Sequence, residues 1–137
     1  MYARHGDLEK AVEEFKKAIE LKPNYGDAYH NLANVYHQMG KDDLAKENYQ
    51  KALEFNPSLW QSHQNLAALY FLEEKFDLAQ QHLLKGVEIN PTNPELYINL
   101  GILYQKFGNK EKANEALQKA LSLDPQNQKA KQLLLSL

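Results

Sequence analysis

Apolar side chains recur every three or four positions in a series of short segments, and turns rich in glycine, proline and asparagine separate these segments. Tyr29, Leu32 and Tyr36 follow this spacing. Residues three and four apart lie on the same face of an α-helix, so the pattern predicts amphipathic helices. We expect helices over residues 8–21, 26–39, 42–55, 60–73, 76–89, 94–107, 110–123 and 127–136.

The helical pattern repeats every 34 residues, and four prolines mark the period: Pro23, Pro57, Pro91 and Pro125. Columns of tyrosine, alanine, small and bulky residues keep the same period: Tyr2, Tyr36, Tyr70 and Tyr104; Ala11, Ala45, Ala79 and Ala113; Ala18, Ala52, Gly86 and Ala120; Phe15, Tyr49, Leu83 and Leu117. A proline cannot continue the helix before it, and a small column lets two helices approach closely. The period therefore predicts a unit of two packed helices closed by proline.

The turn inside each unit carries glycine in three units and glutamate in one: Gly6, Gly40, Gly108 and Glu74. Glycine accepts the left-handed backbone conformation that ends many helices. Asp7 and Asn109 follow two of these glycines and are expected to cap the next helix. Asn93 and Pro94 form a second kind of helix start, a capping residue followed by a first-turn proline.

Taken together, these columns resemble the tetratricopeptide repeat over nearly the whole chain. The resemblance implies an all-α fold, a right-handed superhelical solenoid of antiparallel helix pairs. One domain over 1–137 would hold about three and a half units and a terminal helix: a partial repeat 1–25, repeats 26–59, 60–93 and 94–127, and a helix 128–137. Residues 1–5 are expected to be the remnant of a first helix. We therefore expect a piece of a longer array, with a small complete protein as the alternative.

In this family the first helices of successive units line a concave groove, which implies that residues on those helices bind a peptide. The expected binding residues are Asn31, Asn34, Asn65, Asn99, His30, His37, Gln38, Gln61, Gln64, Phe71, Ile98 and Ile102. The groove is polar in the first complete unit and more apolar towards the last. We expect the ligand to place a hydrophobic anchor near Ile98 and Ile102, whereas Phe71 could equally pack beneath a neighbouring helix.

Asn31, Asn65 and Asn99 occupy equivalent places in three successive units. Each amide offers an acceptor oxygen and two donor hydrogens, so it can bind both polar groups of a peptide backbone. Helices about 8–10 Å apart would let three rungs span roughly six extended residues. The column is similar to the asparagine ladder in the superhelix of O-linked N-acetylglucosamine transferase, which implies backbone binding. The alternative is that these asparagines stabilise neighbouring turns or are relics of duplication.

Composition and charge exclude several other classes of function. The formal net charge of −2 and the absence of a basic stripe argue against nucleic acid, and no apolar run is long enough to span a membrane. No cysteine is present, no phosphate-binding loop or catalytic spacing occurs, and His30 and His37 are too far apart for a helical metal pair. We expect no cofactor, no metal and no catalysis. A cytoplasmic location is the default expectation.

One variant of the family binds the acidic tails of heat-shock chaperones through asparagines and cationic residues. Asn34 and Asn65 align with its asparagines, but His30, Glu95 and Asn99 stand at its cationic places. Because recognition of carboxylates needs cationic donors, this specificity is not expected. The sequence thus predicts a non-catalytic module that binds a protein or peptide. The alternatives are a targeting arm of a larger enzyme, such as a glycosyltransferase, and a scaffold that self-associates through its ends.

Overall fold

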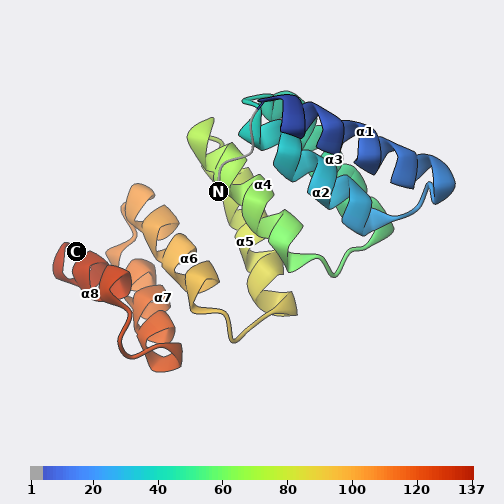
Figure 1. Ribbon diagram of the computed structural model, residues 1–137. Helices are drawn as coiled ribbons and strands as arrows, with labels where there is room; N and C mark the ends of the chain where they lie inside the picture. Colours follow the sequence, from blue (N-terminus) through green and yellow to red (C-terminus); the bar gives the residue numbers. More distant parts are fainter. Residues whose placement is uncertain (1–4) are drawn as a thin grey trace. The chain divides into compact units, whose positions relative to one another are not determined.

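The computed structural model describes residues 5–137, and over this range the regular structure is entirely helical (Figure 1). The helices are α1 (His5–Leu21), α2 (Gly26–Gln38), α3 (Asp42–Phe55), α4 (Trp60–Leu72), α5 (Phe76–Ile89), α6 (Pro94–Lys106), α7 (Lys110–Leu123) and α8 (Gln128–Leu135). The predicted helices are confirmed, and the ends of α2 to α7 agree with prediction within one residue. None of the described helices is long and apolar enough to cross a membrane.

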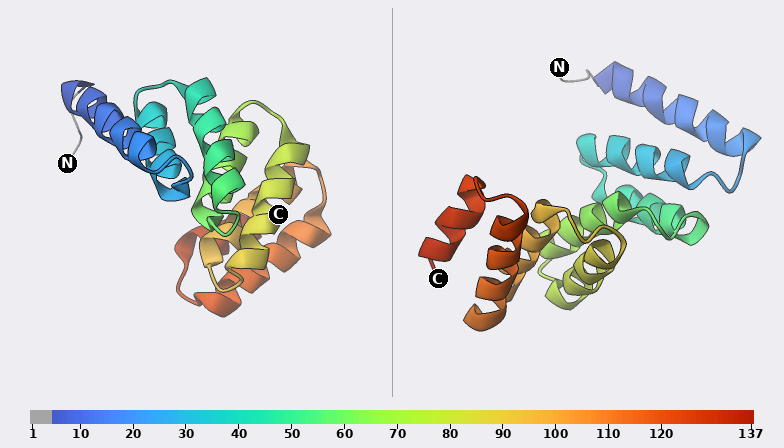
Figure 2. Two further views of the ribbon diagram at one scale, coloured as in Figure 1. Left: turned by 90° about the vertical axis from the view of Figure 1, so that its right-hand side faces the viewer. Right: turned by 90° about the horizontal axis from the view of Figure 1, so that it is seen from below.

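The chain divides into two compact units, Met1–Leu69 and Tyr70–Leu137. In the first unit, α1 and α2 run side by side in opposite directions and are joined by the turn at Pro23 (Figure 2). In the second unit, α6 packs against α7, and α8 packs against both. The division into repeats stays a prediction, because these units are set by packing and not by the period.

The core of the first unit lies where α2 packs on α3. Ala45 and Ala52 of α3 have no exposed surface, and Tyr49 between them is 2% exposed. The fit is close, since a Cβ atom on Gly26 would lie 2.9 Å from the carbonyl oxygen of Ala52. The small column in the sequence thus marks the contact between the two helices of one unit.

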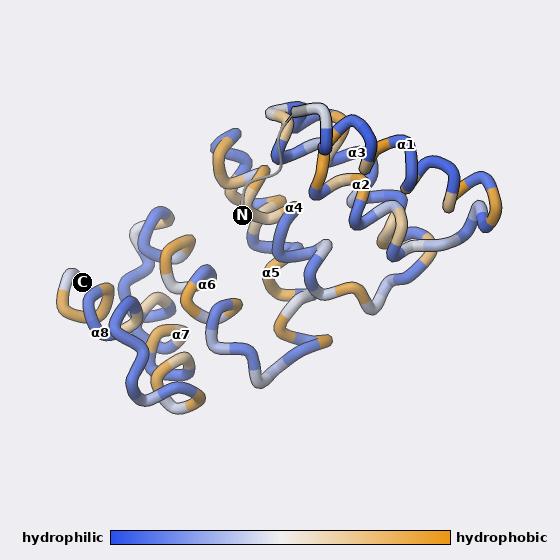
Figure 3. The backbone as a smooth tube through the Cα atoms, in the orientation of Figure 1, coloured by the Kyte–Doolittle hydropathy of each residue, from blue (hydrophilic) through white to orange (hydrophobic). Residues whose placement is uncertain are grey.

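The second unit repeats this packing between α6 and α7. A Cβ atom on Gly101 would lie 2.7 Å from Cγ of Leu117, which is itself 1% exposed. Ile98, Leu117, Ala120 and Ala130 form a buried cluster. Leu133 and Leu134 of α8, together with Leu137 beyond it, pack against this cluster. Figure 3 shows how apolar positions recur along each helix to build these contacts. The last helix therefore covers apolar surface of α6 and α7.

Three of the four predicted turn positions have the left-handed backbone, and Gly6 does not. Gly40 has a φ of 77° and Gly108 a φ of 76°. Glu74 takes the same conformation, with a φ of 60°, although a side chain is strained there. The geometry of the turn is therefore set by the two helices that it joins, and not by the residue that occupies it.

The prediction for Gly6 was wrong. Gly6 lies inside α1 and is not among the residues with positive φ, and Asp7 lies in the first turn instead of capping it. At Gly40 and Gly108 two packed helices force the chain to reverse, whereas Gly6 follows His5 within one continuous helix. The rest of the expected helix remnant over residues 1–5, with Tyr2, lies outside the described residues.

The other predicted helix starts are confirmed. The side chain of Asn109 accepts a hydrogen bond from the backbone N–H of Lys112 at 3.1 Å. Asn93 accepts from the backbone N–H of Glu95 at 3.0 Å, and Pro94 begins α6. These caps satisfy N–H groups that have no partner within the helix.

Candidate functional site

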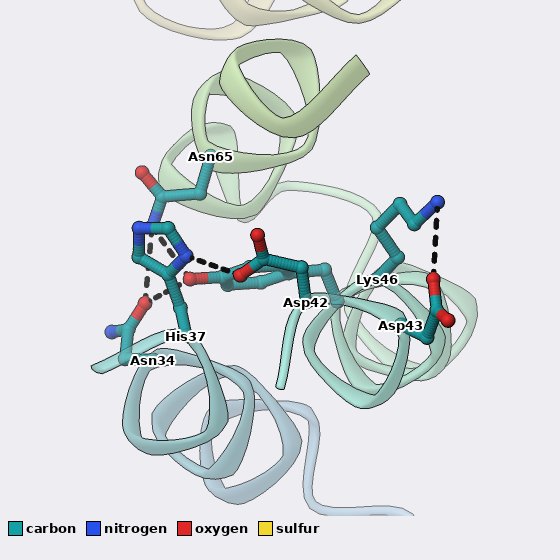
Figure 4. A network of polar contacts seen from close by, with 7 residues as sticks. Asn34, His37, Asp42, Asp43, Lys46 and Asn65 are labelled. Atoms are coloured by element: carbon teal, nitrogen blue, oxygen red, sulfur yellow. Dashed lines mark hydrogen bonds and ion pairs between the residues drawn. The ribbon is translucent and has the colours of Figure 1, made fainter. Parts of the chain in front are cut away.

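A network of polar side chains joins three helices of the first unit (Figure 4). Asn34 comes from α2, Tyr49 from α3 and Asn65 from α4. The hydroxyl of Tyr49 donates to Oδ1 of Asn34. Nδ2 of Asn65 donates to the same oxygen at 3.1 Å and to the Tyr49 hydroxyl at 3.2 Å. The three groups therefore form a closed ring of hydrogen bonds.

The network continues through His30 to the start of α4. Nδ2 of Asn34 lies 3.3 Å from Nε2 of His30, and Nδ1 of His30 lies 2.7 Å from Oγ of Ser62. Because the Asn34 nitrogen can only donate, Nε2 of His30 must accept. The ring proton is then on Nδ1 and is donated to Ser62. The His30 ring also packs on the Tyr49 ring, with centroids 5.5 Å apart.

Burial keeps both titratable groups of the network uncharged at neutral pH. Burial lowers the pKa of His30 below 6.5, and the nearby Asp27 carboxylate opposes this shift only in part. Burial also raises the pKa of Tyr49 to about 12, against the hydrogen bond from Asn65, while Asp42 raises it further. A neutral imidazole and a protonated hydroxyl are the forms that the hydrogen bonds require.

The three asparagines of the predicted ladder have different surroundings. Asn31 is exposed, and its side chain makes no hydrogen bond with the described residues. Asn65 is half-buried, and its amide nitrogen donates to the network through one shared hydrogen. Asn99, on α6, is half-buried and has no side-chain hydrogen bond to the described residues. Equivalent places in the sequence therefore differ in how much hydrogen-bonding capacity they leave open.

The remaining polar candidates of the first unit are exposed or half-buried. His37 is exposed, and its Nδ1 lies 2.9 Å from Oδ1 of Asp42, at the start of α3 (Figure 4). Gln38 and Gln61 are exposed, and Gln64 is half-buried. These side chains leave polar surface on α2 and α4.

The prediction that Ile98 lines the groove was wrong, and a hydrophobic anchor near Ile102, which is half-buried, stays a prediction. Ile98 has no exposed surface and lies in the buried cluster with Leu117 and Ala130, while Ile102 packs against that cluster. The physical reason is α8, which covers this side of α6. Phe71 is half-buried, and its ring meets that of Phe76 edge-on at 5.3 Å.

Sequence reasoning missed Tyr49 and Ser62. Tyr49 was assigned only to the bulky core column, where Phe15, Leu83 and Leu117 carry no hydroxyl. Ser62 stands at the place that is alanine or leucine in the other units and has no exposed surface. The signal was a polar atom in an apolar column, because a buried hydroxyl needs a hydrogen-bond partner.

The described residues contain no group of three or more histidine, cysteine, aspartate or glutamate side chains that could hold a metal ion.

Comparison with known families and structures identifies the class of protein. A family model described as TPR repeat matches residues 1–40, and models described as tetratricopeptide repeat match residues 26–59 and 70–137. The chain belongs to the tetratricopeptide repeat family, and the all-α solenoid predicted from the sequence is confirmed. It is a protein-interaction module of that family.

Individual relatives show what the chain is similar to. The crystal structure of MamA matches with a TM-score of 0.86 and 23% identity, over 98% of this chain and 82% of that one. The first TPR of Spaghetti (RPAP3), bound to the HSP90 peptide SRMEEVD, matches with a TM-score of 0.77 and 25% identity, over 82% and 89%. An uncharacterised protein of Methanocaldococcus jannaschii is 53% identical over 36 residues, which are 26% of this chain and 42% of that protein. The chain thus spans less than half of this relative.

Proposed function

We propose that the chain is a non-catalytic module that binds an extended peptide segment of a partner protein along the first helices of its repeats. The observation that carries this proposal is the open hydrogen-bonding capacity on α2 and α4. The amide of Asn31 is wholly unused, and the carbonyl oxygen of Asn65 and one hydrogen of Asn34 Nδ2 are also open. Donors and acceptors on adjacent helices suit the alternating polar groups of a peptide backbone.

The expected affinity is modest. Each backbone hydrogen bond contributes about 0.5–1.5 kcal/mol net, so four bonds give about 2–6 kcal/mol. A micromolar complex needs about 8 kcal/mol, so side-chain contacts of the ligand must supply the remainder. Backbone bonds discriminate little between sequences. The proposed module therefore accepts a range of peptides and takes its preferences from the side chains around the ladder.

The acidic HSP90 peptide seen in the RPAP3 complex is not the expected ligand. His30 stands at a place where binding of an acidic peptide would need a positively charged side chain. Burial lowers the pKa of His30, which favours the neutral imidazole. Glu95, at a second such place, is an exposed carboxylate that would repel the peptide. We expect SRMEEVD to bind more weakly than peptides selected from a random library.

The test compares two double variants. Asn31→Ala with Asn99→Ala removes two rungs that make no hydrogen bond to the described residues, so the fold should not change. Asn24→Ala with Asn114→Ala removes two exposed asparagines outside the ladder and serves as the control. Peptides selected from a random decapeptide library on the unmodified chain should bind the first variant about tenfold more weakly or worse and the control equally well. Equal binding by both variants would overturn the ladder.

Self-association is a second candidate, favoured by the surface of α1. Phe15 of α1 is half-buried, whereas its equivalents Tyr49, Leu83 and Leu117 are at most 4% exposed. A second copy that covered this face would bury the apolar surface that α1 leaves open. Light scattering over a concentration series tests it, and a strict monomer at high concentration excludes it.

A further inference from the structure

We propose that an apolar surface at two turns of the second unit docks a second copy of this chain. This surface, which we call the aromatic face, consists of Phe71, Leu72, Phe76 and Phe107. All four residues lie in the unit Tyr70–Leu137. The proposal is independent of peptide binding on α2 and α4, and it concerns a different surface from that of α1.

Three phenylalanine rings of the aromatic face form a row that joins the two turns. The ring of Phe71, near the end of α4, meets that of Phe76, at the start of α5, with centroids 5.3 Å apart. The Phe76 ring in turn meets the ring of Phe107, directly after α6, at 6.2 Å and almost at a right angle. Phe107 is 42% exposed, and Leu72, which follows Phe71 in the chain, is 71% exposed. The face therefore leaves apolar surface open to solvent, and clustered surface of this kind marks interaction sites.

The turn between two helices of a unit does not need these rings in order to form. In the first unit, His37 stands at the place of Phe71 and Asp42 at the place of Phe76. Their side chains make a hydrogen bond of 2.9 Å where the second unit has two rings in contact. The equivalent places one period later are again polar and exposed: Gln105 and Lys110. The same turn thus closes with polar side chains, so the rings have a role other than closing it.

The two turns that the row joins carry opposite charges. Residues 73–77 hold three carboxylates and one lysine, which gives this turn a net charge of −2. Residues 106–112 hold three lysines and one glutamate, which gives a net charge of +2. All of these charged side chains are exposed. Four of them make no ion pair with the described residues: Glu74, Asp77, Lys106 and Lys110.

This arrangement of charge favours a second copy over a partner of one sign. A uniformly acidic or basic partner would be attracted at one turn and repelled at the other. A second copy, related by a two-fold axis that crosses the row, places residues 73–77 of each chain opposite residues 106–112 of the other. The rings then pack on the rings, and the favourable contact between unlike charges forms twice. Charge complementarity of this kind fixes the orientation of docking.

The first experiment measures self-association by sedimentation velocity between about 5 and 500 μM, which covers the affinities expected of a small interface. Leu72→Gln with Phe107→Ser removes the two side chains of the aromatic face whose exposure is highest in number, so the fold should be retained. Leu21→Gln with Phe55→Ser is the matched control, since these side chains of the first unit are 89% and 42% exposed. We expect the unmodified chain and the control to dimerise, and the first variant to do so at least about tenfold more weakly. Circular dichroism checks that each variant is folded.

The second experiment exchanges the charges of the two turns. Glu74→Lys with Asp77→Lys reverses the net charge of residues 73–77, and Lys106→Glu with Lys110→Glu reverses that of residues 106–112. Each variant alone would set like charges against each other at both contacts, so each should self-associate at least about tenfold more weakly. In an equimolar mixture of the two variants, unlike charges again meet at both contacts. We therefore expect the mixture to form a heterodimer about as tightly as the unmodified chain dimerises.

Three results would overturn the proposal. An unmodified chain that stays monomeric up to the highest concentration would show that a second copy does not cover the aromatic face. Equal weakening of association by the control and by Leu72→Gln with Phe107→Ser would place the contact elsewhere. A mixture of the two charge variants that associates no better than its components would exclude the two-fold arrangement. Peptide binding is measured separately, so each of these results leaves the proposed function intact.

Discussion

Replacing Tyr49 with phenylalanine tests the polar network at the group where its hydrogen bonds converge. The substitution removes one hydroxyl and keeps the ring, so no cavity forms beside Ala45 and Ala52. Two hydrogen bonds end at this hydroxyl, one donated to Asn34 and one received from Asn65. At about 0.5–1.5 kcal/mol net for each bond, we expect a loss of about 1–3 kcal/mol in the free energy of unfolding.

For a chain of this size, that loss corresponds to a fall in the melting temperature of about 4 °C for each kcal/mol. The assay is urea and thermal denaturation followed by circular dichroism. Tyr36→Phe is the matched control, because the Tyr36 ring is 7% exposed and its hydroxyl has no partner among the described residues. We expect the control to change stability by less than about 0.5 kcal/mol. If both variants lose the same stability, the reasoning about the network is refuted.

Three further predictions concern stability. The pKa of His30 is lowered on folding, so the unfolded chain binds the imidazole proton more tightly than the folded chain does. The free energy of unfolding should therefore be constant above about pH 6.5 and fall below it. Urea titrations at several pH values should show a weaker fall in His30→Gln. Glu74→Gly should stabilise the fold by about 0.5–1 kcal/mol, because glycine removes the strain of a side chain in the left-handed conformation. Gly40→Ala introduces that strain and should destabilise the fold by about 1 kcal/mol. A Glu74→Gly chain that is less stable in urea denaturation would contradict this. Gly101→Ala places a methyl group against the buried Leu117 and should lower the free energy of unfolding by about 1–3 kcal/mol, although alanine favours a helix more than glycine does. A gain in stability measured by thermal unfolding would disprove the close fit.

The helices could be predicted from the sequence because local chemistry sets them. Prolines, turn residues and capping asparagines fix where a helix starts and ends, and the 34-residue period gives each boundary several times over. The prediction for Gly6 was wrong because its column was applied to a residue that lies inside one continuous helix, α1. A turn glycine permits a reversal of the chain, and the packing of two helices makes it necessary.

The site could be predicted only in part, because its contacts depend on the next helix of the solenoid. Asn34, Asn65 and His30 were predicted to line one groove, and the structure joins them in a network of hydrogen bonds that was not foreseen. Ile98 was placed in a groove although α8 covers it. A period shows which residues are equivalent along the chain, but it does not show which of them the following helix buries.

The contacts of His30 and Ile98 explain why polar chemistry gathers in the first unit. His30 meets Ser62, and Ile98 shares a buried cluster with Ala130, so each residue faces the one 32 positions later. The same contact is therefore polar in one unit and apolar in the other. An apolar pair needs only surface to bury, whereas a buried imidazole needs a partner for each ring nitrogen. Ser62 serves one nitrogen and Asn34 the other, and the oxygen of Asn34 then draws in Tyr49 and Asn65. The hydrogen bonds among Asn34, Tyr49 and Asn65 are thus continuous with the contact that His30 makes with Ser62 at the other end of the network.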